Sequence, residues 1–170
     1  MKLEMAIKTA LEYENRIRDL YIEAARRTAD LAGKKIFQAL ADDEQHHVDY
    51  LNSKLDEWQR LGRITVNVLE STIPDKTAIR KAAASLEQKI GEDARGLKQQ
   101  MLSQALTMEL ETSRFYKKLV DTVSTDYQAM FARFLEIGDN HIEAVQFEMD
   151  HLTKTGFWYG FEEFDMEQIG

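Results

Sequence analysis

The sequence predicts an all-α protein in which two repeated helical hairpins form a four-helix bundle. Only one proline and eight glycines interrupt 170 residues. Long stretches consist of Ala, Leu, Glu, Lys, Gln, Arg and Met, which are good helix formers. Apolar residues also recur at helical spacing, and a chain of this length can bury roughly 70% of its unfolded surface in one core.

The first hairpin is indicated by two runs of apolar residues at helical spacing. The runs comprise Ile7, Leu11, Ile17, Leu20, Ala24 and Ala25, followed by Ile36, Leu40, Val48, Leu51, Leu55 and Trp58. We expect the break between the two helices near Gly33. The second helix should end at Gly62, because glycine suits the position that follows a helix.

A long connection at 62–91 separates the two hairpins. Residues 63–73 mix β-branched residues with turn formers, and Pro74 followed by Asp75 predicts the start of a short helix that runs to about Ile90. Two further long helices are expected, from about 92 to 123 and from about 125 to 153. Ser124, Thr125 and Asp126 are good N-cap residues for the second of these.

The chain divides into a bundle at 1–155 and a C-terminal tail at 156–170. The tail reads GFWYGFEEFDMEQIG. It contains too many aromatic residues for a solvated, disordered end. We therefore expect the tail to pack on the bundle or on a partner subunit.

The two halves of the chain also resemble each other. Glu14 and Tyr21 recur as Glu109 and Tyr116 with an offset of 95, and Phe37 and His47 recur as Phe131 and His141 with an offset of 94. Two copies of one hairpin, joined by a long connection, form a bundle with a single crossover.

Composition narrows the possible functions. The 22 basic and 30 acidic residues give a net charge of −8, which argues against a nucleic-acid or anionic-membrane partner. The absence of cysteine excludes disulfides, thiolate metal sites and iron–sulfur clusters. Acidic residues near the start of the chain argue against a signal peptide, and no apolar run of about 18 residues is present. We therefore expect a cytoplasmic protein.

Glu44 and His47 are the first candidates for a functional site. They are three residues apart, so their side chains leave the same face of a helix one turn from each other. Apolar neighbours direct this face inward, where a carboxylate must be paired or must bind a metal. Alone, the pattern is weak, because such pairs arise by chance. The repeat strengthens it by adding Glu14, Glu109 and His141 at related positions.

These residues approach the pattern of di-iron carboxylate bundles, in which two helices each supply one Glu and two others each supply Glu-x-x-His. The segments EYENRIRDLY and LADDEQHHVDYL, with their second-half counterparts, resemble the catalytic domain of the rubrerythrins, within the ferritin-like superfamily. The resemblance covers about residues 5–153. It implies metal ligation by the five residues Glu14, Glu44, His47, Glu109 and His141.

The same resemblance implies that Tyr21 and Tyr116 donate hydrogen bonds that orient the ligands. The alternative is that each tyrosine lies at the edge of the core and bonds a carbonyl oxygen or water. Carboxylate and imidazole donors suit iron or manganese, and zinc can occupy the same ligands. The resemblance implies a di-iron centre.

The resemblance implies an oxidoreductase that reduces peroxide or oxidises iron. The residues alone do not decide between these two activities, nor whether the protein is an enzyme. The rubredoxin-like domain of full-length rubrerythrins is absent, as the lack of cysteine requires. An external rubredoxin-like electron donor would then be needed. We also expect a homo-oligomer, most simply a dimer.

Gly138 departs from the pattern, because it stands where the second Glu-x-x-His requires glutamate. Asp139 could fill the gap only through a local π-bulge, since adjacent residues point about 100° apart on a regular helix. Otherwise water or an exogenous ligand completes an asymmetric or incomplete site. A second hypothesis is therefore a structural or interaction protein with a degenerate metal site.

Overall fold

The computed structural model describes residues 2–29, 31–84 and 96–150. Within these residues it contains helices and no strand, which confirms the predicted fold class. The helices are α1 (Leu3–Arg27), α2 (Leu31–Leu61), α3 (Lys76–Ala84), α4 (Gly96–Thr122) and α5 (Thr125–Asp150).

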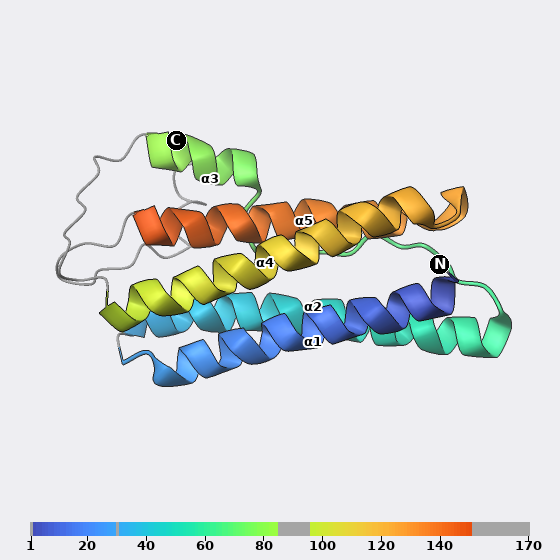
Figure 1. The fold of residues 1–170 in the computed structure, drawn as a ribbon, viewed down its shortest axis with the longest axis horizontal. Coiled ribbons are helices and arrows are strands. Elements are labelled where there is room, and N and C mark those ends of the chain that lie inside the picture. The colour runs from blue at the N-terminus through green and yellow to red at the C-terminus, as the bar shows by residue number, and fades with distance from the viewer. Residues whose placement is uncertain (1, 30, 85–95, 151–170) are drawn as a thin grey trace.

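The four long helices form the ferritin-like bundle that the repeat predicts (Figure 1). Helices α1 and α2 make one antiparallel hairpin, and α4 and α5 make the other. The connection after α2 returns along the bundle, so that α4 runs antiparallel to α1, and the short helix α3 packs on α5. This is a four-helix bundle with one crossover.

The break between α1 and α2 lies a few residues before Gly33, which is itself buried in the first turn of α2. The first helix ends earlier, at Thr28, whose backbone turns to an extended conformation with ψ 118°. The Thr28 hydroxyl donates to the Ala24 carbonyl at 2.7 Å and satisfies an end carbonyl of the helix. A single glycine inside a long helix is tolerated at a loss of about 1 kcal/mol relative to alanine.

Other predicted boundaries agree with the structure. Gly62 follows α2 with a φ of 66°, and its N–H donates to the Trp58 carbonyl at 2.8 Å. The Asp75 carboxylate accepts the Thr77 N–H at 2.8 Å and caps the start of α3. The expected continuation of this helix to Ile90 reaches beyond the described residues.

The core consists of two apolar clusters separated by a polar layer. One cluster, which includes Ile17, Phe37 and Leu102, fills the half of the bundle where α1 ends. The other, which includes Ile7 and Phe131, fills the half where α1 begins. The four long helices each pass through both clusters, and the candidate ligands lie between them along every helix. The fold thus places these polar side chains far from either end of the bundle.

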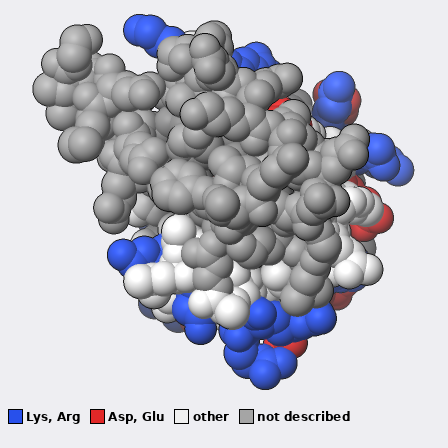
Figure 2. Space-filling view, turned by 90° about the vertical axis from the view of Figure 1, so that its left-hand side faces the viewer, with Lys and Arg blue, Asp and Glu red and all other residues white. Residues whose placement is uncertain are grey.

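Charge at the end of α1 suits the helix dipole. Arg26 and Arg27 occupy the last turn of α1, where cations complement the partial negative charge of the helix terminus. The end-on view of this side of the molecule shows Lys and Arg side chains gathered along its lower edge (Figure 2).

None of the described helices has the length and apolarity needed to cross a membrane. The expected packing of the tail at 156–170 lies outside the described residues.

Candidate metal centre

The structure brings the five predicted ligands together in the middle of the bundle. Each long helix contributes to the group, with α2 supplying two of the side chains. All five are at most 3% exposed, and His141 is fully buried. The five residues are Glu14, Glu44, His47, Glu109 and His141. A buried cluster of this composition needs positive charge, protons or a metal to compensate its carboxylates.

Glu44 lies between the two histidines and faces both. Its Oε2 atom is 3.1 Å from Nδ1 of His47, and its Oε1 atom is 2.8 Å from Nδ1 of His141. The two imidazole rings are nearly parallel, with centroids 5.5 Å apart. Glu44 is therefore placed to serve two neighbouring metal positions at once.

Two sets of three residues could each hold a metal ion. In the first set, Glu14 and Glu44 accompany His47; in the second, Glu44 and Glu109 accompany His141. Within each set the potential ligand atoms lie within 4.8 Å of one another. Glu44 belongs to both sets, so that each candidate position has two carboxylates and one imidazole.

The two tyrosines bind the glutamates of the opposite hairpin. Tyr21 on α1 donates to Glu109 Oε1 at 2.7 Å, and Tyr116 on α4 donates to Glu14 Oε1 at 2.5 Å. Both tyrosines are buried. The hydroxyls therefore bond the candidate ligands rather than backbone carbonyls. This exchange ties α1 to α4 at the level of the centre.

Asp43 is a member of the centre that sequence reasoning missed. It is fully buried on α2, and its Oδ2 atom lies 2.7 Å from His141 Nε2 and 3.5 Å from His47 Nε2. Ser71 and Thr72, in the connection after α2, donate to the same carboxylate. The available signal was its position four residues before His47, on the same helix face.

Asp43 and the two histidines form a third set with metal-ligand spacing. The contacts of Asp43 favour another role. Its Oδ1 atom accepts the N–H and hydroxyl of Thr72, and its Oδ2 atom accepts Ser71 and His141. Asp43 Oδ2 is therefore suited to hold the proton on His141 Nε2, and it lies 3.5 Å from His47 Nε2 without a hydrogen bond to it. Nδ1 of each histidine is then left to face the glutamates.

The position of Gly138 remains without a carboxylate. Helix α5 is α-helical throughout Thr125–Asp150, so no π-bulge turns Asp139 inward. The Asp139 carboxylate instead lies 3.7 Å from the Lys76 ammonium and 3.5 Å from the Ser113 hydroxyl. The centre therefore has three glutamates where the full pattern has four.

Burial and mutual charge shift the pKa values of the centre. Burial, reinforced by the negative charge of Glu44, raises the pKa of Glu14 to about 8. Burial would also raise the pKa of Glu44, but the attraction of His47 and His141 outweighs it and gives about 2. The same attraction overcomes burial at both histidines and raises their pKa well above 6.5. Without metal, protons therefore neutralise part of the buried charge.

The donor set also fits a metal ion. Glu44 Oε2 and His47 Nε2 are buried and have no hydrogen-bond partner among the described residues. In the protein interior, an unpaired carboxylate oxygen is costly. A cation between Glu44 Oε2 and His47 Nδ1 would satisfy that oxygen and replace the protons. His46 is exposed and takes no part in the centre.

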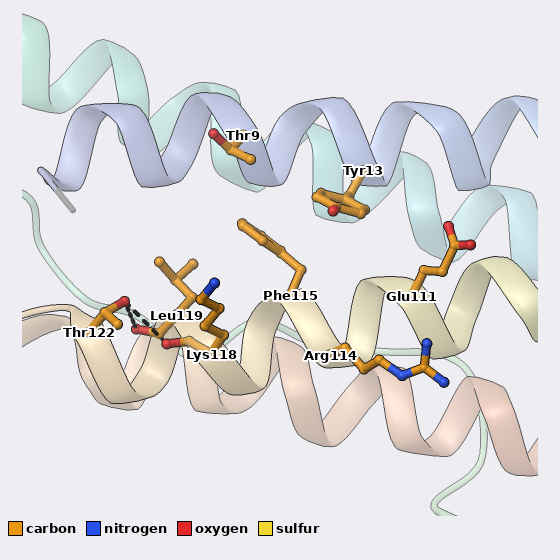
Figure 3. A pocket seen from close by; sticks show the side chains of 8 residues that line it. All are labelled: Thr9, Tyr13, Glu111, Arg114, Phe115, Lys118, Leu119 and Thr122. Carbon is orange, nitrogen blue, oxygen red and sulfur yellow. Dashed lines mark hydrogen bonds between the residues drawn. The ribbon is translucent and has the colours of Figure 1, made fainter.

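A groove between α1 and α4 lies apart from the centre. It has a volume of about 630 Å³ and is lined by the stacked rings of Tyr13 and Phe115, whose centroids are 4.5 Å apart (Figure 3). Arg114, Lys118 and Glu111 line it from α4. None of the candidate ligands lines this groove, so it is a separate surface feature.

Comparison with known proteins gives one relative. Bacterioferritin of Streptomyces coelicolor is 39% identical to this chain over 56 residues, which are 32% of the chain and 34% of the relative. The match thus covers about a third of the length of that relative. No family model and no solved structure matches the chain. Together with the bundle, this similarity supports a ferritin-like helical protein, without distinguishing a subtype.

Proposed function

We propose that this chain is a rubrerythrin-like iron protein of the ferritin-like class, with a dinuclear iron centre in the bundle. Glu14, Glu44 and His47 would hold one ion, and Glu44, Glu109 and His141 the other. The observation that carries this proposal is the position of Glu44 between two histidines, with one carboxylate oxygen toward each.

Iron is favoured by the ligands and by the similarity to a bacterioferritin. Mixed carboxylate and imidazole donors without thiolate suit iron or manganese, and zinc can occupy the same ligands. Asp43 would keep the Nε2 proton of His141 in place, so that its Nδ1 lone pair faces an ion. Tyr21 and Tyr116 would fix the orientation of Glu109 and Glu14.

When bound, two ferrous ions would supply the two electrons that, with two protons, reduce one hydrogen peroxide to two waters. The two buried apolar clusters exclude bulk water from both sides of this layer. Re-reduction would require an external electron donor, such as a rubredoxin-like protein. The alternative activity at the same ions is the oxidation of iron for storage or handling. We further propose that the protein acts as a homo-oligomer.

Metal analysis tests the iron centre directly. We expect protein purified from iron-replete cells, or apo-protein titrated with ferrous iron without oxygen, to hold close to two ions per chain. A matched Glu44→Gln variant should hold almost none. Less than about 0.2 metal ions per chain in the unmodified protein would contradict the proposal, because ligand sets of this kind should retain metal.

Mixing the ferrous protein with peroxide or with oxygen then separates the two activities. Fast oxidation by peroxide, followed by turnover with an added electron donor, supports peroxide reduction. Fast oxidation by oxygen with continued uptake of iron supports iron handling. The rival hypothesis, a structural or interaction protein with a degenerate site, is motivated by Gly138. It predicts no metal-dependent activity and no change in cellular peroxide resistance on Glu44→Gln.

A further inference from the structure

Gly138 lies on the stripe of α5 that faces the bundle, and its backbone is partly exposed. On a helical wheel of 100° per residue, Gly138 lies between Val145 and Phe131, which are both fully buried. It also precedes His141 by three residues, as Glu44 precedes His47. A side chain at this position would therefore extend toward the metal centre.

Space is available at this position. A Cβ atom placed on Gly138 would meet no atom within 4 Å other than those of its own helix and chain neighbours. Asp139 is turned away toward Lys76 and Ser113. None of the described side chains thus replaces the missing carboxylate. The result is a gap on the inner face of α5, beside His141.

The repeat indicates which metal positions the gap serves. Glu44 directs one oxygen toward His47 and the other toward His141. Because Gly138 is its counterpart in the second hairpin, a carboxylate there would also face both positions. The loss of that carboxylate leaves three carboxylates on the Nδ1 side of the two histidines, because the fourth buried carboxylate, Asp43, faces their Nε2 atoms instead. Both positions therefore lack one anionic ligand on the same side.

We propose that a small oxyanion with the two-oxygen geometry of a carboxylate, such as bicarbonate, formate or acetate, binds in the Gly138 gap and bridges the two metal positions. This inference rests on the proposed dinuclear centre. The anion would stand where a glutamate side chain would otherwise end. Because its binding depends on the ions, metal and anion should tighten each other by the same factor.

The experiment uses full-length protein loaded with Co²⁺, whose visible absorption reports on its ligands. Co²⁺ is titrated in the presence of sodium acetate, sodium formate or sodium chloride at equal ionic strength. We expect acetate and formate to change the absorption spectrum and to tighten Co²⁺ binding about 5- to 150-fold relative to chloride, the usual range of such coupling.

Three variants localise the effect. Gly138→Glu supplies the carboxylate within the chain, so it should bind Co²⁺ tightly without added anion and lose the response to acetate. Gly138→Leu fills the gap without a ligand atom and should abolish the response. Tyr13→Phe, in the surface groove apart from the centre, is the control and should keep the response. Circular dichroism confirms that each variant is helical.

The outcomes separate this inference from the proposed function. If the unmodified protein binds two Co²⁺ ions but responds equally to acetate and chloride, the anion site is overturned and the dinuclear centre stands. A full acetate response in folded Gly138→Leu would also overturn it, because the anion would then bind elsewhere. Failure of the unmodified protein to bind Co²⁺ would reject both.

Discussion

The two hairpins of the bundle make unequal contributions to the same centre. Each supplies one glutamate, one tyrosine and one histidine at related positions. Only α2 adds Asp43 and Glu44, while α5 has Ile137 and Gly138 in their places. Asp43 and Glu44, each of which faces both His47 and His141, therefore come from the same helix. The remaining candidate ligands occur once in each hairpin.

The largest effect should follow substitution of the shared ligand. Glu44→Gln replaces one carboxylate oxygen by an NH2 group that cannot bind metal, and it removes the negative charge that faces both positions. We therefore expect the iron content to fall from two ions per chain to nearly none. Glu14→Gln and Glu109→Gln each alter one position and should leave about one ion. Gly138→Ala, at the counterpart of Glu44, should leave two. Anaerobic titration with ferrous iron measures each value, and equal losses in all four variants would contradict a shared Glu44.

The pH should shift the balance between protons and metal at this centre. Metal binding requires Glu14 to lose a proton that its pKa of about 8 retains at neutral pH, and requires neutral histidines. Each net proton released makes binding tenfold tighter per pH unit. We expect at least about a hundredfold tighter binding of Co²⁺ at pH 8 than at pH 6. Affinity independent of pH would show that the ligands are already deprotonated.

The stability of the metal-free protein should change in the opposite direction. A pKa raised by folding stabilises the protein below the unfolded value, and this stability is lost as the pH rises through the folded value. Glu14 rises from 4.5 to about 8, and both histidines rise well above 6.5. We therefore expect the Tm without metal to fall between pH 5.5 and 8.5. Differential scanning calorimetry with and without metal measures this change, and the increase in Tm on metal binding should grow with pH.

Asp43 should matter through the histidines rather than through direct ligation. Asp43→Asn keeps the shape of the side chain, but its single oxygen replaces only one of the two carboxylate oxygens, so its NH2 group must face either the histidine Nε2 atoms or the donors of Thr72. We therefore expect metal affinity to fall about 10- to 100-fold. Both positions should weaken, because Asp43 faces both Nε2 atoms. Asp42→Asn, on the exposed side of the same helix, is the matched control. Full metal affinity in Asp43→Asn would show that Asp43 does not act through the histidines. Its contacts with Thr72 and Ser71 would then explain why the side chain is buried.

Much of this arrangement could be predicted from spacing along single helices. The separation of Glu44 and His47, and the repeat that added Glu14, Glu109 and His141, depend only on helical periodicity and on the similarity of the two halves. The structure places all five together. Gly62 at the end of α2 could be predicted for a similar local reason, since a left-handed residue after a helix favours glycine.

Contacts between segments distant in sequence could not be predicted in this way. Asp43 becomes part of the centre because Ser71 and Thr72 return over it, and periodicity does not report where a connection packs. The pairing of each tyrosine with the opposite hairpin depends on the antiparallel placement of α1 and α4. The sharing of Glu44 depends on the distance between α2 and α5. The break after α1 lies a few residues before Gly33, because α2 already includes this glycine in its first turn.

The smallest effects should come from substitution of the two tyrosines. Because Tyr21 and Tyr116 occupy related positions, their substitutions compare the two hairpins directly. Tyr116→Phe removes the donor of Glu14 Oε1, and Tyr21→Phe leaves Glu109 Oε1 with only the contact to His141 Nδ1 at 3.2 Å. Each change should destabilise the metal-free protein by about 1–3 kcal/mol in urea unfolding. Tyr13→Phe, in the surface groove, should change little. The loss from Tyr116→Phe should grow as the pH rises through about 8, because its partner Glu14 becomes charged there and hydrogen bonds to charged groups are stronger. If both losses are equal and independent of pH, the buried charge is not concentrated on Glu14, and the two halves of the centre are electrostatically alike.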